Sequence, residues 1–394
     1  MTEPALLVFQ FLKQIIRFVL NWWWVAGPVI LGPAVWNSWM DYKHFKTLVG
    51  FNWKLLEIKI PSEVEKSPLA MEQVFAVLQG ALYKGAWWRR YIQGRIQEWF
   101  SLEMVSISGD LHFYIRMVDI HRNLAEAAIY AQYPQAEIYE VEDYTLDVPN
   151  EVPNETHNLF GAELVLARED PYPIRTYKDF EFQTLKGVGN VDPIAAVTEA
   201  MAKLKDGEQY WIQINSIPID WDWKKPGDEI VAKLMGKPKK AGPPGSYSAA
   251  VLKKELGDYF SGAVQAPFKY PEYEPFKFGS PKSEGPASLM QYLSPGEREI
   301  VEGVEKKISK VGFKTTIRVI YLARKEVFYV PTFFSVVASL RQLGTQHMNS
   351  IKWNGATITA GKFPFKKNKE NFRKKWLLYK YRRRRYGEKT SDGR

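Results

Sequence analysis

An uncharged apolar stretch near the N-terminus places the strongest constraint on how this chain can fold. Residues 19–40 contain no Asp, Glu, Lys or Arg. As a helix, this stretch would span about 33 Å, enough for the roughly 30 Å hydrocarbon core of a bilayer. Five tryptophans lie near its ends, where aromatic side chains gather at membrane interfaces: Trp22, Trp23, Trp24, Trp36 and Trp39. The sequence therefore predicts one transmembrane helix with these tryptophans at the interface.

Two other interpretations of this stretch stay open. The pairs Gly27-Pro28 and Gly32-Pro33 also fit a re-entrant hairpin, and an apolar N-terminal run also fits a signal peptide, cleaved or uncleaved. The orientation of a spanning helix follows from its flanks, because four lysines follow it within residues 43–59 and only two cations precede it. This asymmetry predicts a single-pass protein of the cell membrane, with the bulk of the chain in the cytoplasm.

The residues after this membrane anchor (1–48) alternate between strand and helix patterns. In residues 51–146 the order is β-α-β-β-α-β, with Ser108-Gly109-Asp110 as a tight hairpin turn. The strands are expected over 56–60, 100–107, 111–118 and 136–141, and the helices after Ser67-Pro68 and over 120–132. This order is typical of a ferredoxin-like domain, a four-stranded antiparallel sheet with two helices on one face.

A similar order returns in residues 154–360 and predicts a second ferredoxin-like domain. Its strands are expected over 159–167, 177–185, 209–217, 313–322 and 350–353, and its helices over 194–204 and 332–343. An insert over 218–311 interrupts it, with helices expected over 248–260 and 295–310 and a partner-ordered or mobile loop over 267–286. The second helix of the insert opens with the capping-box pattern Ser294-x-x-Glu297. The expected class is thus α+β, with internal duplication as a plausible origin.

Patterns that carry catalysis are missing or incomplete. The chain has no Cys, which excludes disulfides and thiolate metal sites, and it has no G-x-x-x-x-G-K-[ST] phosphate loop. Gly187-x-Gly189-x-x-Asp192 fits a turn with a helix N-cap better than a phosphate site. The remaining candidates are the five histidines and an acidic cluster, which lack metal-ligand spacing: His44, His112, His121, His157 and His347, and Glu137, Glu140, Glu142 and Asp143. We therefore expect no catalytic residues, no metal and no cofactor, and the alternative of an unrecognised enzyme rests on these two groups.

The C-terminal segment, residues 361–394, makes the whole chain basic. Its 14 Lys plus Arg against three acids give a charge of +11, whereas the net charge of the chain is +10. If the segment is helical, Phe372, Trp376 and Tyr379 align as an aromatic ridge among cations. Anionic headgroups, nucleic-acid phosphates with base stacking, or an acidic partner could each bind such a segment, and a solvated tail without a ligand is the alternative. The residues expected to bind a polyanion or partner are Lys374, Lys375, Trp376, Lys380, Arg382, Arg383, Arg384 and Arg385.

Several phrases of the sequence resemble one family. They are the Trp-rich apolar stretch, LLEIKIPSEVEKSPLAMEQVF, VSISGDLHFYIRMVDIHRNLAEAAIYAQYPQAEIYEVEDYT and DPIAAVTEAMAKLKDGEQYWIQI. Together they resemble the membrane-proximal N-terminal part of bacterial conjugation-type, type IV secretion-like ATPases of the FtsK/HerA superfamily. GFKTTIRVIYLARKEVF and YKYRRRRYG resemble the stretch that leads into the ATPase domain of that family. The sequence departs from the family by ending where that domain would begin, so no functional residue carries over.

The resemblance implies a non-catalytic accessory or scaffold protein of the membrane, partnered by a separate FtsK/HerA-type ATPase in DNA or protein translocation. The residues alone imply a membrane-anchored protein with tandem ferredoxin-like domains and a basic tail. A membrane-tethered nucleic-acid-binding protein is the alternative function. The partners expected are therefore membrane lipids, that ATPase, and DNA or anionic lipid at the C-terminal segment.

Overall fold

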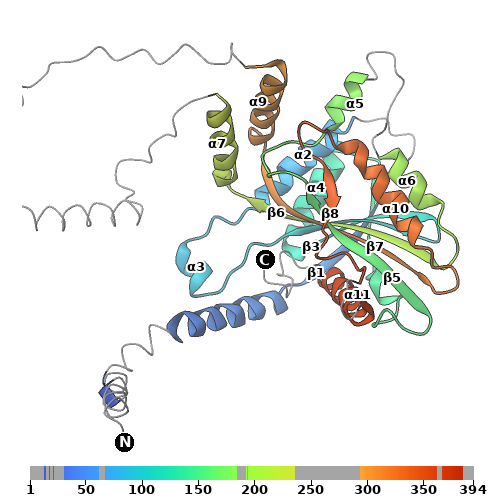
Figure 1. The fold of residues 1–394 in the computed structure, drawn as a ribbon, viewed down its shortest axis with the longest axis horizontal. Helices are drawn as coiled ribbons and strands as arrows, with labels where there is room; N and C mark the ends of the chain where they lie inside the picture. The colour runs from blue at the N-terminus through green and yellow to red at the C-terminus, as the bar shows by residue number, and fades with distance from the viewer. Residues whose placement is uncertain are drawn as a thin grey trace, which may run out of the picture.

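The fold is an α+β arrangement around one antiparallel sheet. The computed structural model describes residues 13–14, 17, 21, 31–61, 67–183, 192, 194–235, 293–361 and 366–384. Within this part of the chain, eight strands pair in the order β4-β1-β3-β2-β6-β7-β5-β8 (Figure 1). The strands are β1 (Trp53–Lys59), β2 (Phe100–Ile107), β3 (Asp110–Val118), β4 (Glu137–Glu140), β5 (His157–Leu166), β6 (Glu208–Ile219), β7 (Gly312–Arg324) and β8 (Ile351–Trp353).

The strand order divides the sheet into two halves of the same topology. Numbered within each half, the strands of β1–β4 and of β5–β8 both lie in the order 4-1-3-2, which is the order expected for a ferredoxin-like unit. The second strands of the two halves, β2 and β6, pair antiparallel from Phe100↔Ser216 to Ile107↔Gln209. The halves thus share one continuous sheet, in which two equivalent edge strands form the seam.

The hairpin between β2 and β3 follows from its turn residues. Ser108 and Gly109 both have positive φ, 53° and 96°, which is the conformation of a two-residue hairpin turn whose twist matches that of the strands. The equivalent position in the second half, between β6 and β7, holds the long insert instead. The expected hairpin and the expected position of the insert are both confirmed.

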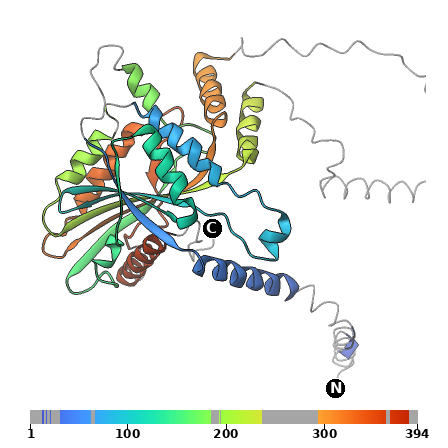
Figure 2. The same ribbon diagram turned by 180° about the vertical axis from the view of Figure 1, so that it is seen from behind.

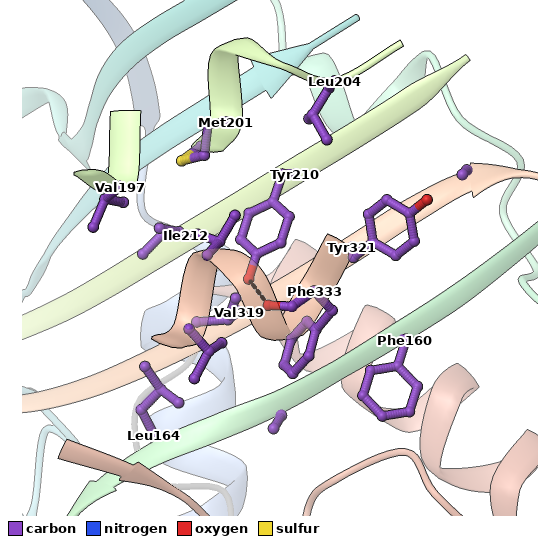
Figure 3. Packing of buried hydrophobic residues seen from close by; sticks show 14 residues of the cluster. Phe160, Leu164, Val197, Met201, Leu204, Tyr210, Ile212, Val319, Tyr321 and Phe333 are labelled. Carbon is purple, nitrogen blue, oxygen red and sulfur yellow. Dashed lines mark hydrogen bonds between the residues drawn. The ribbon is translucent and has the colours of Figure 1, made fainter. Parts of the chain in front are cut away.

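Four helices cover one face of the sheet, two over each half (Figures 1 and 2). They are α2 (Leu69–Leu78), α4 (Arg122–Gln132), α6 (Ala195–Ala202) and α10 (Val330–Ser339). Side chains of α2 and α4 pack on Leu56, Phe100 and Ile115 of the first half. In the second half, Figure 3 shows Tyr210 of β6 reaching α10, where its hydroxyl donates to the carbonyl oxygen of Phe333 at 3.1 Å.

The opposite face of the sheet is covered by α11 (Lys366–Arg383), as both ribbon views show. Leu377, Leu378 and Tyr381 of α11 pack on strand residues such as Trp211 and Ile320. Strand alternation explains this second core, because Tyr210 and Ile212 point to the four-helix face and the intervening Trp211 points to α11. Most of the basic segment is therefore a helix of the folded unit.

The remaining elements lie around this sandwich. Residues 31–49 form a helix that leads away from the sheet, close to α3 in both views. A pair of helices, α7 and α9, packs through Val231, Val301 and Val304. The bounds are α3 (Trp87–Tyr91), α5 (Tyr177–Gln183), α7 (Lys225–Leu234) and α9 (Pro295–Ile308), with short 3-10 helices η1 (Gln79–Ala81), η2 (Asp119–His121), η3 (Tyr144–Leu146), η5 (Trp221–Lys224) and η7 (Leu340–Leu343).

The strand predicted over residues 177–185 is wrong, because residues 177–183 form helix α5. The cause is local capping. Asp179 accepts from the backbone N–H of Thr176 at 2.7 Å and from its hydroxyl at 3.3 Å, a bond that closes the first turn of a helix. Helix α7 was not predicted, whereas the capping box of Ser294 and Glu297 at the start of α9 is confirmed.

The N-terminal apolar stretch is described only in part. Residues 22–30 lie outside the described residues, and with them Trp22, Trp23 and Trp24. The expected helix over 248–260 and the loop over 267–286 also lie outside. Among the residues that the structure describes, no helix combines the length and the apolar character needed to cross a bilayer.

Candidate functional site

Helix α11 carries most of the residues that the sequence singled out, and it has two chemically different sides. One side faces the sheet and holds Lys374, Lys380 and Tyr381, exposed by 4%, 1% and 0%. The other side faces solvent and holds Phe372 and Tyr379, exposed by 57% and 39%. The periodicity of the helix thus sorts one basic-aromatic segment into an internal set and an external set.

The internal set is centred on a buried ion pair. The guanidinium of Arg384 donates from Nε to Glu103 Oε1 at 2.6 Å and from Nη2 to Glu103 Oε2 at 3.0 Å, and both side chains are fully buried. Arg384 also pairs with Asp143. Tyr144 donates to the same Glu103 carboxylate at 2.8 Å. A bidentate ion pair of this kind fixes the position and orientation of the end of α11.

The end of α11 is further held by donors from other elements. Arg384 has φ of 50°, a left-handed conformation that non-glycine residues rarely adopt. The indole of Trp99 donates to the carbonyl oxygen of Arg384 at 2.7 Å, and the amide of Gln213 donates to that of Tyr381 at 3.0 Å. These bonds satisfy carbonyls that a helix end leaves without partners. The left-handed turn is therefore maintained by the surrounding contacts.

A second buried cation, Arg318 of β7, extends this network across the sheet. Its Nε donates to Glu163 at 3.1 Å, and its Nη1 donates to Gln213 at 3.1 Å. The ammonium of Lys380 lies 3.6 Å from the same Glu163 carboxylate. The buried cations under α11 are thus paired with acids of β2 and β5. These ion pairs hold the helix against the sheet.

Burial alone would raise the pKa of the Glu103 carboxyl, but the charge of Arg384 and the donated hydrogen bonds outweigh burial and lower this pKa. The pKa of Asp143 is lowered in the same way against its own burial. For the phenol of Tyr144, burial acts together with the negative charge of Glu103, and the pKa rises well above its usual value. At neutral pH the cluster therefore holds two carboxylates and a neutral phenol around Arg384.

The basic residues predicted to bind a polyanion do not form one surface. Lys374, Lys380 and Arg384 are buried, which conflicts with the prediction that they contact an external ligand. The guanidinium of Arg382 donates to four backbone carbonyls of the segment between the halves. Lys375 pairs with Glu151 at 2.5 Å, and Arg385 lies outside the described residues. A charge run in the sequence could not reveal which cations have internal partners.

The external side of α11 carries an aromatic ridge, which confirms the alignment expected from helical spacing. The rings of Phe372 and Trp376 stack at 6.4 Å with planes 9° apart, and those of Trp376 and Tyr379 stack at 5.4 Å with planes 13° apart. The exposed Arg383 continues the row, with its guanidinium carbon 4.3 Å from the centroid of the Tyr379 ring. We call these four residues the α11 ridge. Lys366, Lys367 and Lys369, all exposed, lie on the first turn of the helix.

The other sequence candidates are separated or engaged in ordinary ion pairs. His112 bonds to Glu57 at 2.7 Å, and His121 lies 3.8 Å from Glu98. Of the acidic cluster, Glu140 pairs with Lys54 and Arg122, and Asp143 belongs to the network under α11. In the part of the chain that the structure describes, no three His, Asp or Glu side chains gather as a metal site. Gly187 and Gly189 lie outside that part.

The N-terminal side offers a second exposed surface. On the helix of residues 31–49, Trp36 and Trp39 are 51% and 48% exposed. Leu31 and Val35 are 62% and 66% exposed. The helix therefore presents large apolar side chains that the described part of the fold does not cover.

Residues 52–328 match the model of a family described as a domain of unknown function, DUF8128. The chain belongs to this family. The DUF8128 match begins at β1 and ends after β7, so that it includes Glu103, Asp143 and Arg318, while α11 and the helix of residues 31–49 lie outside it. No curated protein and no solved structure matches the chain.

Sequence reasoning missed the polar strand residues that bind α11 and Arg318. Glu103, Glu163 and Gln213 lie on strands whose neighbours on the same face are apolar, such as Val105 and Trp211. A polar residue at an inward position of an otherwise apolar strand indicates an internal partner, because burial without one is costly. Such polar residues at inward positions are visible in the sequences of β2 and β6, but the sequence does not show which residue each of them contacts.

Proposed function

We propose that this protein is a membrane-anchored, non-catalytic binding module that works beside a translocation ATPase of the FtsK/HerA type. The observation that carries the proposal is the division of α11. Its cations toward the sheet have partners within the fold, while Phe372, Tyr379 and Arg383 of the α11 ridge stay exposed and Trp376 between them is half-buried. An aromatic row of this kind, ending in Arg383 on a helix that the sheet holds in place, has the composition that dominates protein interfaces.

The membrane half of the proposal is supported by the N-terminal region. The uncharged residues 19–40 are long enough to span a bilayer as one helix, and the helix of residues 31–49 exposes Leu31, Val35, Trp36 and Trp39. The protein would then be a single-pass component of the cell membrane with its sheet on the cytoplasmic side. The ATPase and the type IV secretion or conjugation setting come from the sequence resemblance.

Purification from native membranes tests both halves. Membranes washed with carbonate or high salt should retain the protein, since an inserted apolar segment binds far more tightly than surface charge does. Mild-detergent extracts should contain a P-loop ATPase together with this chain, as identified by mass spectrometry. Release by salt would overturn the anchor, and consistent recovery without such an ATPase would overturn the partnership.

The α11 ridge itself is tested by a matched pair of variants. Trp376→Ala removes the central ring, with which Phe372 and Tyr379 stack, and should speed dissociation of the partner with little effect on association. Tyr329→Ala changes an aromatic residue that is 63% exposed and lies directly before α10, outside the helix that carries the ridge, and should leave the kinetics unchanged. Equal kinetics for the two variants would exclude the ridge as the contact.

A membrane-tethered nucleic-acid-binding protein is the second candidate, favoured by the stacking geometry of the same ridge. Parallel rings with an adjacent guanidinium are a stacking platform for single-stranded bases, and Lys366, Lys367 and Lys369 could contact phosphates. Single-stranded DNA should then bind with a strong salt dependence, with a slope of roughly −0.7 per phosphate contact. Arg383→Gln should reduce that slope, and a slope near zero would exclude this candidate.

A further inference from the structure

The loop of residues 82–97, which carries α3, extends from the sheet on the side where the helix of residues 31–49 leaves it (Figures 1 and 2). We call it the α3 loop. Its sequence, GAWWRRYIQGR over residues 85–95, mixes aromatic and basic residues. Trp88, Tyr91 and Ile92 are 40%, 41% and 57% exposed. Large apolar side chains exposed next to one another are typical of surfaces that contact a partner or a membrane.

The α3 loop is coupled to the N-terminal helix through Gly94. The hydroxyl of Thr47 donates to the carbonyl oxygen of Gly94 at 3.0 Å. A Cβ built on Gly94 would lie 2.5 Å from the Cβ of Lys43, and Gly94 has φ of 70°. Only glycine permits this approach and this backbone conformation. The loop and the helix therefore contact each other closely on the side of the helix that carries Thr47.

The far side of this helix is a continuous apolar stripe. With 100° per residue, six side chains fall within about 120° of arc, and each is between 48% and 70% exposed: Leu31, Val35, Trp39, Tyr42, Phe45 and Val49. Met40 lies on the opposite side, at 9% exposure. The stripe therefore faces away from the α3 loop, and the two are related along the helix axis: Lys43, which contacts Gly94, follows the uncharged stretch 19–40 by three residues, so the α3 loop lies near the end of the segment that the proposed anchor places in the bilayer.

Cations accompany the aromatic side chains of both segments. The Lys43 ammonium lies 4.8 Å from the ring of Trp39, and the Arg89 guanidinium lies 5.2 Å from the ring of Trp88. Lys46 is also exposed, and the acid on the same helix is Asp41. Aromatic rings beside cations are the composition of a segment that rests in the headgroup layer of an anionic membrane.

We infer that the α3 loop is a second membrane contact, with Trp88, Tyr91 and Ile92 in the headgroup region of an anionic bilayer. The inference rests on the proposed membrane anchoring of the N-terminal region and adds to it a fixed orientation. One helix alone would let the sheet rotate about its attachment, whereas two contacts hold α3 toward the lipid and leave the α11 ridge at a set angle to the membrane.

Site-specific labels test the inference, because the chain contains no Cys and single labels are unambiguous. The full chain with Ile92→Cys carries an environment-sensitive fluorophore and is reconstituted into vesicles of equal parts phosphatidylcholine and phosphatidylglycerol. Brominated lipid should quench this label. The same label at Tyr329→Cys, an exposed residue directly before α10, should not be quenched, because α10 lies over the half of the sheet far from α3 (Figure 1).

A third label, at Val35→Cys, reports the anchor itself. Quenching at Val35 without quenching at Ile92 would overturn the inference and leave the anchor intact, whereas the absence of quenching at both would overturn both. Arg89→Gln in the Ile92→Cys chain should lower the ratio of inserted to retracted label about fivefold, since one surface cation is lost. Equal quenching in phosphatidylcholine alone would overturn the anionic assignment. A lipid-independent signal that rises with protein concentration would indicate a second copy of the chain as the occupant instead.

Discussion

Arg384 belongs to a run of basic residues that the sequence alone would place in solvent, yet its charge is buried inside the fold. Its side chain is fully buried against Glu103, and its backbone has a left-handed φ. We predict that Arg384→Gln lowers the free energy of unfolding by about 3–5 kcal/mol, because it leaves a buried carboxylate without its ion-pair partner. Chemical denaturation measures this change.

The adjacent residue provides the control. Arg383 is exposed, so Arg383→Gln should change the free energy of unfolding by no more than about 0.5 kcal/mol. The double variant Glu103→Gln/Arg384→Gln should lose less than the sum of its single variants, since it removes the buried Glu103 charge together with Arg384 and leaves only the less buried Asp143 without its ion-pair partner. Similar effects of Arg383→Gln and Arg384→Gln would contradict the buried pair.

The same ion pair predicts an acid-sensitive stability. The folded-state pKa values of Glu103 and Asp143 lie below the ordinary values of 4.5 and 3.8. Their contribution is therefore fully present above these ordinary values and is lost as the pH falls through the lowered folded pKa values. Denaturation curves over this acidic range should show falling stability, with a shallower fall in Glu103→Gln. An equally steep fall in that variant would assign the acid sensitivity to other carboxylates.

Among the elements, α11 combines a side packed on the sheet with an outer side that carries the ridge proposed to bind a partner, and substitutions can separate the two. Leu377→Ala, on the buried side, should cost about 2–5 kcal/mol through the cavity that it leaves. Phe372→Ala, on the exposed ridge, should leave the denaturation midpoint nearly unchanged while it weakens retention of the bound partner or nucleic acid. Loss of stability in both variants would mean that the ridge is also part of the packing.

The helix and strand patterns predicted elements well where local chemistry agreed with the period. The ridge alignment in α11, the capping box of α9 and the hairpin at Ser108-Gly109 follow from rules that act over a few residues. Residues 177–183 also obey a local rule, the cap between Thr176 and Asp179, but their alternating pattern pointed to a strand. Where two local signals conflict, the sequence alone does not rank them.

At the scale of the whole molecule, the seam between β2 and β6 makes the eight strands one sheet. We predict a single cooperative unfolding transition for the region from β1 to α11, detected alike by tryptophan fluorescence and by circular dichroism. A fragment limited to residues 51–146 should aggregate, because it would expose the paired edge of β2. Two separate transitions, or a stable monomeric fragment, would show that the halves fold independently.

The sequence predicted the four strands of the first half and, apart from the strand wrongly expected over 177–185, those of the second, but not the seam or the place of the basic helix. Strand periodicity reports which face a residue occupies and is silent about which edge pairs with which. The partners of Arg384 are 281 and 241 residues away in the chain, a separation at which no local pattern operates. The two-sided apolar character of β6 was the available sign that a further element covers the second face.

The position of α11 on the sheet also has a consequence for biosynthesis. The N-terminal apolar residues leave the ribosome first, whereas Arg384 is made 281 residues after the Glu103 that receives it. At roughly 5–20 residues per second, translation leaves the Trp211 face of the sheet uncovered for on the order of ten seconds or more. During that interval the nascent chain exposes an apolar surface. A chaperone that covers this surface until α11 is made would therefore lower the risk that nascent chains aggregate, although the surface is buried in the folded protein.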